Sequence, residues 1–249
     1  MKEEQKSWYE SWFNTPYYHI LYKERDLIEA QQFIKKLALW LNIKSGSSIL
    51  DVACGKGRHS IFLNQLGYEV TGIDLASESI EFARKSENDT LHFYCHDMRK
   101  DYYLNYFDVV VNLFTSIGYF EDNRDNLASI KAMARNLRPG GVLVLDFFNE
   151  TWIKNTLVKQ IHKQVEGIEF DIKKTIENGK IVKTIQFSDK GQIFHFKEEV
   201  SLLSYDDFSI MFEQAGISIE HRFGNYNLDP FHREVSERLI LIGRKQKEI

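Results

Sequence analysis

Acidic residues and glycines are spaced along residues 49–60 in a way that suits the binding of a small polar ligand. Residues 49–52 are apolar apart from Asp51, which predicts a short buried strand that carries one carboxylate. Gly55 and Gly57 follow, and because neither has a Cβ, the backbone can turn sharply there and approach a ligand closely. A helical pattern begins at Gly57. A strand, a glycine-rich turn and a helix in this order form the ligand-binding corner of a doubly wound α/β sheet.

A second carboxylate, Asp74, ends the next predicted strand, residues 68–74, about twenty residues after the turn. At that spacing an acidic residue accepts hydrogen bonds from the two hydroxyls of a ribose. The turn by itself is weak evidence, because Ser60 stands where the dinucleotide fingerprint G-x-G-x-x-G has its third glycine. Turn and carboxylate together predict a cofactor that contains adenosine.

Five motifs, in their order along the chain, resemble those of the class I S-adenosylmethionine-dependent methyltransferases. They read LDVACGKG at 50–57, GID at 72–74, DM at 97–98, FDVV at 107–110 and LRPGG at 137–141. The motifs cover about residues 45–150, and AG at 215–216 with RLILI at 238–242 extends the resemblance. Ala53 is a departure, since the family usually has the first glycine of its turn there. NAD-dependent dehydrogenases share the arrangement of strand, turn and helix but lack this ordered set of motifs, so they are a distant alternative.

The resemblance implies that S-adenosylmethionine is the cofactor and that these residues surround it: Asp51, Gly55, Gly57, Arg58, Asp74, Leu75, Asp97, Met98 and Asn112. It implies that Asp74 accepts from both ribose hydroxyls, that Asp97 binds the exocyclic amine of the adenine, and that Met98 covers the face of the ring. It also implies that Asp51 supports the amino end of the cofactor, whose amino group the backbone of residues 112–114 receives.

The first helical turn after Gly57 offers backbone N–H groups that suit the cofactor's carboxylate. Arg58 could add a charge-assisted bond to the same carboxylate, or it could be a solvated residue of that turn. Both interpretations remain open. We expect no metal site.

Alternating strand and helix patterns place these residues in a parallel sheet with right-handed crossovers. Further strands are predicted at 91–95, 107–114 and 142–148, and a helix at 125–137 is expected to stop at the turn formed by residues 138–141. The fold class is therefore α/β, with a doubly wound, mostly parallel, seven-stranded sheet. In the family the second strand lies between the first and third, and residues 217–223 and 237–244 would close the sheet as an antiparallel pair, with the last strand antiparallel to the rest.

After residue 150 the period changes to two, which predicts an antiparallel β meander inserted after the fifth strand. Asn178-Gly179 is a strong hairpin signal, and residues 189–191 form another turn. Lys183 is an exception on an otherwise apolar face that includes Ile185 and Phe187. The segment is too long for an ordinary loop, so we expect it to cover a functional site.

The first part of the chain is unusually aromatic: Trp8, Tyr9, Trp12, Phe13, Tyr17, Tyr18 and Tyr22. One interpretation is a cap packed over one end of the sheet. The other, which we favour by the resemblance, is a lid that closes over the cofactor and the acceptor.

These patterns divide the chain into four parts: residues 1–44, the aromatic lid and a helix; 45–150, the cofactor-binding core; 151–204, the β insertion covering the site; and 205–249, a helix and strand pair that complete the sheet.

Methyl transfer from a sulfonium is an in-line displacement, so positioning supplies much of the rate and a base is needed only when the acceptor must lose a proton. Candidate bases are Tyr18, His19, His195 and His232, although any one histidine is more often structural. The Pro-Pro-Tyr motif for exocyclic amines of DNA bases and the Pro-Cys nucleophile for pyrimidine carbon are both absent. A small-molecule acceptor fits best. The alternatives are a cofactor-binding sensor or degenerate subunit without activity and, less favoured, an RNA methyltransferase.

Composition limits the partners. The net charge of −4 weighs against a large nucleic-acid footprint, which needs a basic surface. No apolar run approaches the length of a membrane-spanning helix, and the charged residues 1–6 do not open a signal peptide. The two cysteines make no disulfide framework and no metal cluster, and a reducing cytoplasm fits them best. The acceptor, its reacting atom and the oligomeric state stay open.

Overall fold

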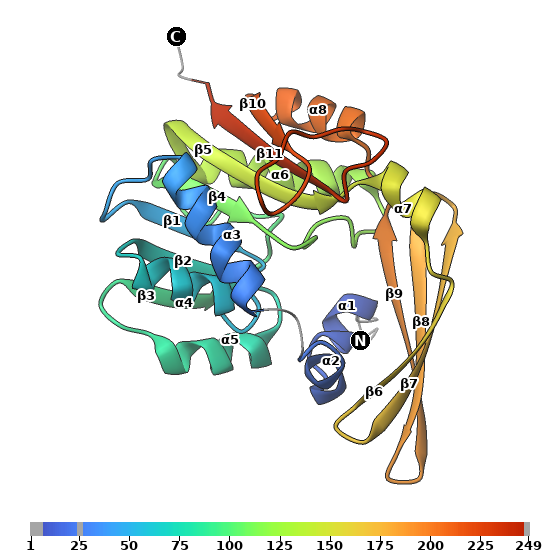
Figure 1. Ribbon diagram of the computed structural model, residues 1–249. Coiled ribbons are helices and arrows are strands. Elements are labelled where there is room, and N and C mark those ends of the chain that lie inside the picture. The colour runs from blue at the N-terminus through green and yellow to red at the C-terminus, as the bar shows by residue number, and fades with distance from the viewer. Residues whose placement is uncertain (1–6, 24–26, 247–249) are drawn as a thin grey trace, which may run out of the picture.

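The computed structural model describes residues 7–23 and 27–246, and its centre is a seven-stranded sheet (Figure 1). The strands lie in the order β3-β2-β1-β4-β5-β11-β10. Their bounds are β1 (Ser48–Val52), β2 (Glu69–Asp74), β3 (Leu91–Cys95), β4 (Phe107–Asn112), β5 (Leu137–Phe148), β10 (Ile217–Phe223) and β11 (Arg238–Lys245). Strands β1 to β5 are parallel to one another, whereas β11 runs antiparallel to both β5 and β10. The predicted doubly wound sheet with an antiparallel last strand is confirmed.

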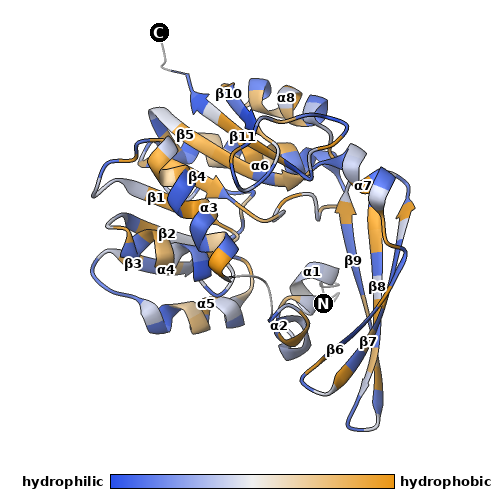
Figure 2. Ribbon diagram, in the orientation of Figure 1, coloured by the Kyte–Doolittle hydropathy of each residue, from blue (hydrophilic) through white to orange (hydrophobic). Residues whose placement is uncertain are grey.

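Helices cover both faces of this sheet because its strands are apolar on both sides (Figure 2). One core cluster joins Ile49 and Val109 to the helices α3 (Leu27–Trp40), α4 (Arg58–Gln65) and α5 (Ser77–Ala83). The other joins Leu50 and Val110, which alternate with the first pair, to α6 (Asn123–Asn136) and α8 (Tyr205–Gln214). A short 3₁₀ turn, η1 (Arg84–Ser86), continues α5.

The segment between α6 and the main part of β5 differs from the expectation. Residues 138–141 were predicted to be a turn, but β5 already begins at Leu137, which pairs with Phe107 before the register shifts to Val142 opposite Val109. The helix ends at Asn136, whose buried side-chain oxygen accepts the backbone N–H groups of Tyr102 and Tyr103 at 2.9 and 3.1 Å. The helix thus ends one residue before the predicted position, and the proline and glycines form an irregular strand start.

A second sheet, here called the insert sheet, follows β5 and stands beside the core (Figure 1). Its order is β6-β7-β8-β9, and all neighbouring strands are antiparallel. The elements are α7 (Glu150–Thr156), β6 (Gln160–Val165), β7 (Ile168–Glu177), β8 (Lys180–Asp189) and β9 (Gln192–Ser201). Both predicted hairpin turns are present, at 178–179 and 190–191, whereas α7 and β6 carry no clear period-two signal and were not predicted.

Two short helices, α1 (Trp8–Trp12) and α2 (Pro16–Leu21), lie between the core and the insert sheet (Figure 1). We call them the N-terminal helices. Thr15 caps α2, and Pro16 stands at its first position, where a missing N–H costs nothing. Trp12 and Leu21 are buried in an apolar cluster with Phe170 and other residues of the insert sheet. The aromatic segment is thus anchored to the insert sheet.

Two further observations concern chain-wide expectations. Within residues 7–23 and 27–246, none of the helices combines the length and the apolar character that crossing a bilayer requires. Cys54 and Cys95 are both free thiols. They follow β1 and end β3, and β2 lies between these strands as predicted.

Candidate active site

A cavity of about 290 Å³ opens at the carboxyl ends of β1 and β2, and we call it the first cavity. Its volume is at the lower end of the range for small-ligand sites. It brings together most of the predicted cofactor residues: Asp51, Gly55, Arg58, Asp74, Leu75, Asp97 and Met98. Two predicted residues, Gly57 and Asn112, are described by the structure but do not line this cavity.

The glycine-rich turn faces the first cavity with open space in front of it. Gly55 has a φ of +56°, and no described heavy atom lies within 4 Å of the point where a Cβ would stand. A side chain there would occupy the cavity. Gly57 has a different role, since a Cβ on it would meet the Phe93 ring at 2.5 Å. Gly57 therefore allows α4 to pack on the sheet, and only Gly55 leaves room for a ligand.

Asp51 is buried at the end of β1, and Ser60 on α4 donates a hydrogen bond to it at 2.6 Å. This contact explains the serine at the place of a third glycine. Burial raises the pKa of Asp51 to about 7, against the opposing effect of the Ser60 bond. A cationic group beside Asp51 would favour the ionised carboxylate.

Asp74 ends β2 and ties the glycine-rich turn to that strand. Its two oxygens accept the backbone N–H groups of Gly55 and Ala76, each at 2.8 Å. Burial raises the pKa of Asp74, and these two hydrogen bonds oppose the shift. The carboxylate keeps further lone pairs for a ligand, so its structural role and the predicted binding role are compatible.

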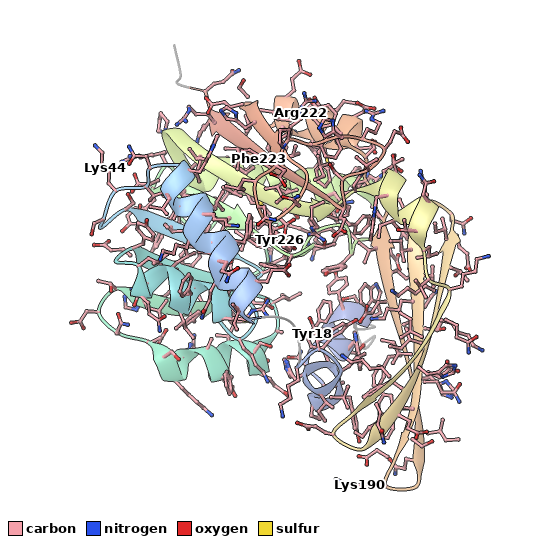
Figure 3. All side chains as sticks on the ribbon, in the orientation of Figure 1. Tyr18, Lys44, Lys190, Arg222, Phe223 and Tyr226 are labelled. Atoms are coloured by element: carbon pink, nitrogen blue, oxygen red, sulfur yellow. The ribbon has the colours of Figure 1, made fainter. Side chains whose placement is uncertain are left out.

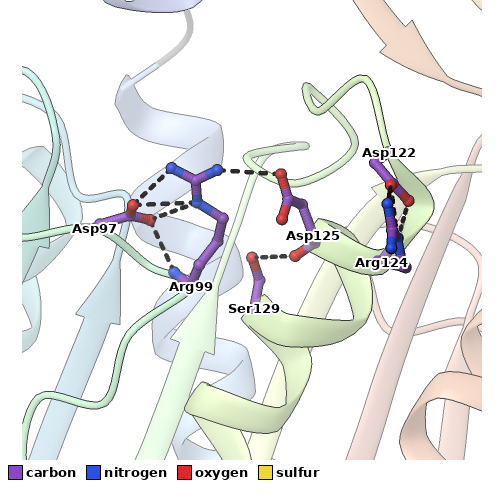
Figure 4. A network of polar contacts seen from close by, with 6 residues as sticks. All are labelled: Asp97, Arg99, Asp122, Arg124, Asp125 and Ser129. Carbon is purple, nitrogen blue, oxygen red and sulfur yellow. Dashed lines mark hydrogen bonds and ion pairs between the residues drawn. The ribbon is translucent and has the colours of Figure 1, made fainter.

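Asp97 is held by an arginine that the sequence analysis did not single out (Figure 4). Arg99 donates from Nε and Nη2 to the two oxygens of Asp97 at 2.7–3.1 Å, and from Nη1 to Asp125 at 3.1 Å. Its guanidinium also lies 5.1 Å from the centre of the Phe120 ring. Partial burial acts to raise the pKa of Asp97, but the bonds from Arg99 lower it overall. Arg99 therefore keeps Asp97 ionised, and an adenine amine that binds there would donate to a carboxylate that already accepts from Arg99.

Asn112 is the predicted cofactor residue whose side chain points elsewhere. It is fully buried, and its amide donates to the backbone oxygen of Val52 at 3.0 Å, which links β4 to β1. The predicted role at Asn112 belongs to the backbone of residues 112–114, which this side-chain contact does not test, so it stays a prediction. The residues after it, Leu113 and Phe114, line the first cavity.

The N-terminal helices supply the opposite wall. Tyr18 and His19 both line the first cavity. Burial lowers the pKa of His19 to about 4, and the charge of Lys56 adds to the shift, so the imidazole is neutral at physiological pH. The Tyr18 ring packs against those of Phe13 and Tyr22, with centroids 4.9 Å apart in each pair.

A second cavity of about 380 Å³ adjoins the first. The two share five lining residues: Phe13, Tyr18, Arg58, Phe114 and Tyr119. Beyond them the second cavity is lined by Trp8, Glu29, Thr115, Phe148, Glu198, Val200, Tyr226 and Arg238. Tyr18 and Tyr226 both lie near the centre of the molecule, towards the space between core and insert sheet (Figure 3). The sequence did not identify Tyr226, Arg238 or Glu198 as site residues. Lys183, the exception on an apolar face of β8, was the signal that could have pointed to Glu198.

Glu198 on β9 connects the insert sheet to the N-terminal helices. It accepts hydrogen bonds from the Trp12 indole and the Tyr22 hydroxyl, each at 2.7 Å, and pairs with Lys183 at 3.3 Å. Lys183 also contacts the Tyr22 hydroxyl. The lysine that interrupted the apolar face of β8 is thus the partner of a partly buried carboxylate.

Two candidate bases lie outside both cavities. His195 alternates with Phe194 and Phe196 along β9 and is exposed on the other face of the insert sheet, where it lines a separate depression with Asp171. His232 is exposed in the loop before β11. The structure therefore corrects the expectation for both, and of the four candidates Tyr18 and His19 lie at the site. Among the described residues, no three His, Cys, Asp or Glu side chains are grouped to hold a metal ion.

A sheet of this order, with a glycine-rich turn after β1 and carboxylates at the ends of β1, β2 and beyond β3, defines the class I S-adenosylmethionine-dependent methyltransferases. Residues 49–141 match the family described as "Methyltransferase domain". The chain is 30% identical over 189 residues, 72% of this chain and 78% of the relative, to the dTDP-3-amino-3,4,6-trideoxy-alpha-D-glucopyranose N,N-dimethyltransferase of Streptomyces venezuelae. The chain belongs to this methyltransferase family and is an enzyme that uses S-adenosylmethionine as methyl donor.

Two solved structures are similar in fold. An S-adenosylmethionine-dependent methyltransferase from Clostridium acetobutylicum superimposes with a TM-score of 0.78 at 18% identity, covering 92% of this chain and 96% of that one. The sugar N-methyltransferase KedS8 from a Streptoalloteichus species gives 0.73 at 23% identity, covering 92% and 93%. Both matches span nearly the whole chain and so extend beyond residues 49–141. The predicted class, cofactor and enzymatic nature are confirmed.

Proposed function

We propose that the enzyme transfers the methyl group of S-adenosylmethionine to an amine nitrogen of a small polar molecule held in the second cavity. The observation that carries the proposal is the shared wall of five residues between the two cavities. One cavity has the carboxylates that suit the cofactor, and the other lies between the core, the N-terminal helices and the insert sheet. Because these five residues line both cavities, a methyl donor in the first cavity and an acceptor in the second would meet at the boundary that they form.

Within the first cavity, each predicted residue has a place that suits its role. Asp51 would face the amino end of the cofactor, where burial makes the carboxylate sensitive to a cation. Asp74 would accept the ribose hydroxyls, and the open space at Gly55 would admit the backbone of the ligand. Leu75 and Met98 supply apolar surface for the adenine, next to Asp97. Bound there, S-adenosylmethionine supplies an activated methyl group on a sulfonium.

Arg58 lines both cavities, and its guanidinium lies 5.4 Å from the centre of the Phe114 ring. We assign it to the boundary between cofactor and acceptor, where it can bond the cofactor's carboxylate. This favours the binding role over that of a solvated helix residue.

An amine acceptor fits the bases that the site offers. A hydroxyl must lose its proton during transfer, which requires a base whose pKa lies near the working pH. His19, with a pKa of about 4, is poorly matched to that task. An amine that reaches the site unprotonated attacks without such a base. Glu29 and Glu198 line the second cavity and can receive amine N–H groups.

The names of two similar proteins support an amine as the acceptor. The Streptomyces venezuelae relative is named as an N,N-dimethyltransferase of an amino sugar nucleotide, and KedS8 is named as a sugar N-methyltransferase. Quinone-type O-methyltransferases also match, but over less than half of this chain. Amino sugars are therefore the first acceptors to test.

The test is transfer of a labelled methyl group from S-adenosylmethionine to a panel of free and nucleotide-linked amino sugars, amino acids, peptides with free N-termini, catechols and an RNA pool. We expect label on nitrogen of a small amine, and far less with Asp74→Ala at the same enzyme and cofactor concentrations. Label found only on oxygen, or only on RNA, would contradict the proposal.

A further inference from the structure

Residues 113–116 follow β4 and form the wall segment between the two cavities. Phe114 and Thr115 both have left-handed backbone conformations, with φ of +59° and +62°. Residues with a Cβ rarely adopt this backbone conformation, and two such residues in succession persist only when surrounding contacts hold them. Phe114 lines both cavities, so the conformation of this segment sets the boundary between them.

One buried carboxylate holds the wall segment in place. Asp146 on β5 is fully buried, and its side chain accepts the Phe114 backbone N–H at 2.8 Å. Its main-chain oxygen accepts the next N–H, that of Thr115, at 3.0 Å. Both strained residues are therefore anchored to the same aspartate.

Two residues that follow the insert sheet in the sequence complete the cluster around Asp146. Arg238 on β11 donates from Nε and Nη2 to Asp146 at 2.9 and 2.7 Å, and from Nη2 to the Thr115 hydroxyl at 3.0 Å. The Tyr226 hydroxyl donates to the other Asp146 oxygen at 3.2 Å. The Tyr226 ring also packs against the Phe114 ring, with centroids 5.1 Å apart. Thus every hydrogen bond of the Asp146 side chain that the structure shows goes to the wall segment or to a residue that supports it.

A buried ion pair is an expensive way to stabilise a fold, since apolar residues of similar volume often do as well. Here the pair adds two contacts that apolar residues cannot, namely an acceptor for the Phe114 N–H and a donor to the Thr115 hydroxyl. Moreover, the Phe114 ring stacks on His59 at 4.5 Å and lies beneath Arg58, so a shift of Phe114 would also move groups on the cofactor side.

We propose that Asp146 is a positioning residue for methyl transfer, supported by Arg238 and Tyr226, and that it fixes the Phe114–Thr115 wall at which cofactor and acceptor meet. The inference rests on the proposed function for its kinetic consequence, but the conformational part stands on its own. Loss of the cluster should loosen the wall and reduce turnover, since small displacements of aligned reactants cost much of the rate.

The decisive variant is the double substitution Asp146→Leu with Arg238→Met, which removes both charges together and so avoids an unpaired buried ion. Its matched control is Glu220→Leu with Arg244→Met, which removes an ion pair that also involves β11, at the far end from the cavities. For each protein we would measure the melting temperature, hydrogen exchange of the Phe114 and Thr115 amides, the calorimetric Kd of S-adenosylmethionine, and transfer to the best amine of the panel.

We expect both double variants to fold. Only the first should exchange the Phe114 and Thr115 amides at least about tenfold faster than wild type, and only it should lose kcat, by about thirtyfold or more at saturating cofactor. Tyr226→Phe, which removes one donor and keeps the ring, should shift both readouts in the same direction by a smaller amount. Wild-type exchange and wild-type kcat in the folded double variant would overturn the proposal.

If the double variant does not fold, Tyr226→Phe carries the test, and wild-type exchange and turnover there would overturn the positioning role. A wild-type enzyme that methylates none of the amines contradicts the proposed acceptor class instead. In that case the amide exchange rates alone decide whether Asp146 holds the wall.

Discussion

The two sides of the site are built by different means. The cofactor side is made of backbone turns and carboxylates at strand ends, held by contacts such as the two N–H groups on Asp74. The acceptor side is made of aromatic rings and a few buried charges from segments far apart in the chain, as in the Trp12–Glu198 contact between α1 and β9. The first depends on the sheet, and the second depends on packing between the N-terminal helices and the insert sheet.

This difference predicts which measurements each side controls. Changes at the strand ends should alter the affinity for S-adenosylmethionine and leave the acceptor wall intact. Changes in the aromatic wall should alter turnover and the KM of the acceptor, with little effect on cofactor affinity. In each variant, cofactor binding and methyl transfer should therefore be measured side by side.

The largest effect is expected from Asp74→Ala. The variant loses a carboxylate that accepts the Gly55 and Ala76 N–H groups and, by the proposal, the ribose hydroxyls. S-adenosylmethionine binding should weaken by about 2–4 kcal/mol, which calorimetry measures. Asp89→Ala, which removes an exposed carboxylate in the loop before β3, serves as the control. Unchanged affinity in Asp74→Ala would remove Asp74 from the cofactor site.

On the acceptor side, Tyr18→Ala should lower turnover by roughly ten- to a hundredfold, because the ring helps to shape the wall shared by the two cavities. S-adenosylmethionine affinity should stay within about threefold, since the carboxylates are untouched. Methyl-transfer kinetics, calorimetry and thermal melting on one preparation separate these effects. Equal losses of affinity and turnover would show that the two sides are not independent.

Tyr18→Phe is the companion variant, since it keeps the ring and removes the hydroxyl. If the tyrosine acts only as part of the wall, its turnover should stay near that of wild type. A loss as large as that of Tyr18→Ala would give the hydroxyl a direct role, as the sequence analysis considered when it included Tyr18 among the candidate bases.

The sequence predicted the cofactor side better than the acceptor side, and for a physical reason. Gly55, Asp51 and Asp74 are fixed by local turn chemistry and by the order of parallel strands, both of which leave regular spacings in the chain. Glu198, Tyr226 and Arg238 meet only through the antiparallel strands β9 and β11 and a loop, and no spacing connects them. Even so, Lys183 on an apolar face was a visible sign of a partly buried carboxylate nearby.

Strand alternation decides which side chains of a strand can face the site. Asn112 lies at the expected strand end, where its side chain donates to the Val52 backbone oxygen, and its predicted role rests on its backbone. His195 was considered because histidine is a common base, yet the same alternation places it on the outer face of the insert sheet. Residue type and position along the chain suggested a role, and the face of the strand decided against it.

Asp51 predicts a pH dependence confined to the cofactor side. Because burial raises its folded-state pKa to about 7 from 3.8, the ligand-free protein should lose stability as pH rises from about 4 to about 7. A bound amino group favours ionised Asp51, so the cofactor affinity should rise across the same range, by up to about tenfold per pH unit, and level off above it. Calorimetry between pH 5.5 and 7.5 measures this.

The control is Asp51→Asn, which cannot ionise and should bind the cofactor weakly with a flat pH profile over that range. Turnover should follow this pH profile only at cofactor concentrations that do not saturate the enzyme. A wild-type affinity that does not change between pH 5.5 and 7.5 would mean that Asp51 does not face the cofactor's amino group.

The smallest effect concerns Ala53, the departure from the family's glycine. Ala53 has a φ of +61°, a conformation that costs an alanine roughly 1–2 kcal/mol. Ala53→Gly relieves this strain, but glycine also increases the conformational entropy of the unfolded chain, which lowers the stability by about 0.4–1 kcal/mol. The net gain in stability should be about 0–1.6 kcal/mol, which corresponds to a rise of no more than about 6 °C in melting temperature for a chain of this length.

Gly55→Ala is the matched reverse substitution, because Gly55 has a similar φ of +56° two residues along the same turn. It should lose about 1 kcal/mol of stability from the left-handed conformation, and its Cβ would stand in open space that the cofactor is proposed to fill. S-adenosylmethionine affinity should therefore fall in Gly55→Ala and stay unchanged in Ala53→Gly. If both substitutions leave the affinity unchanged, the turn positions α4 but does not touch the cofactor, and the cofactor side would depend on its carboxylates alone.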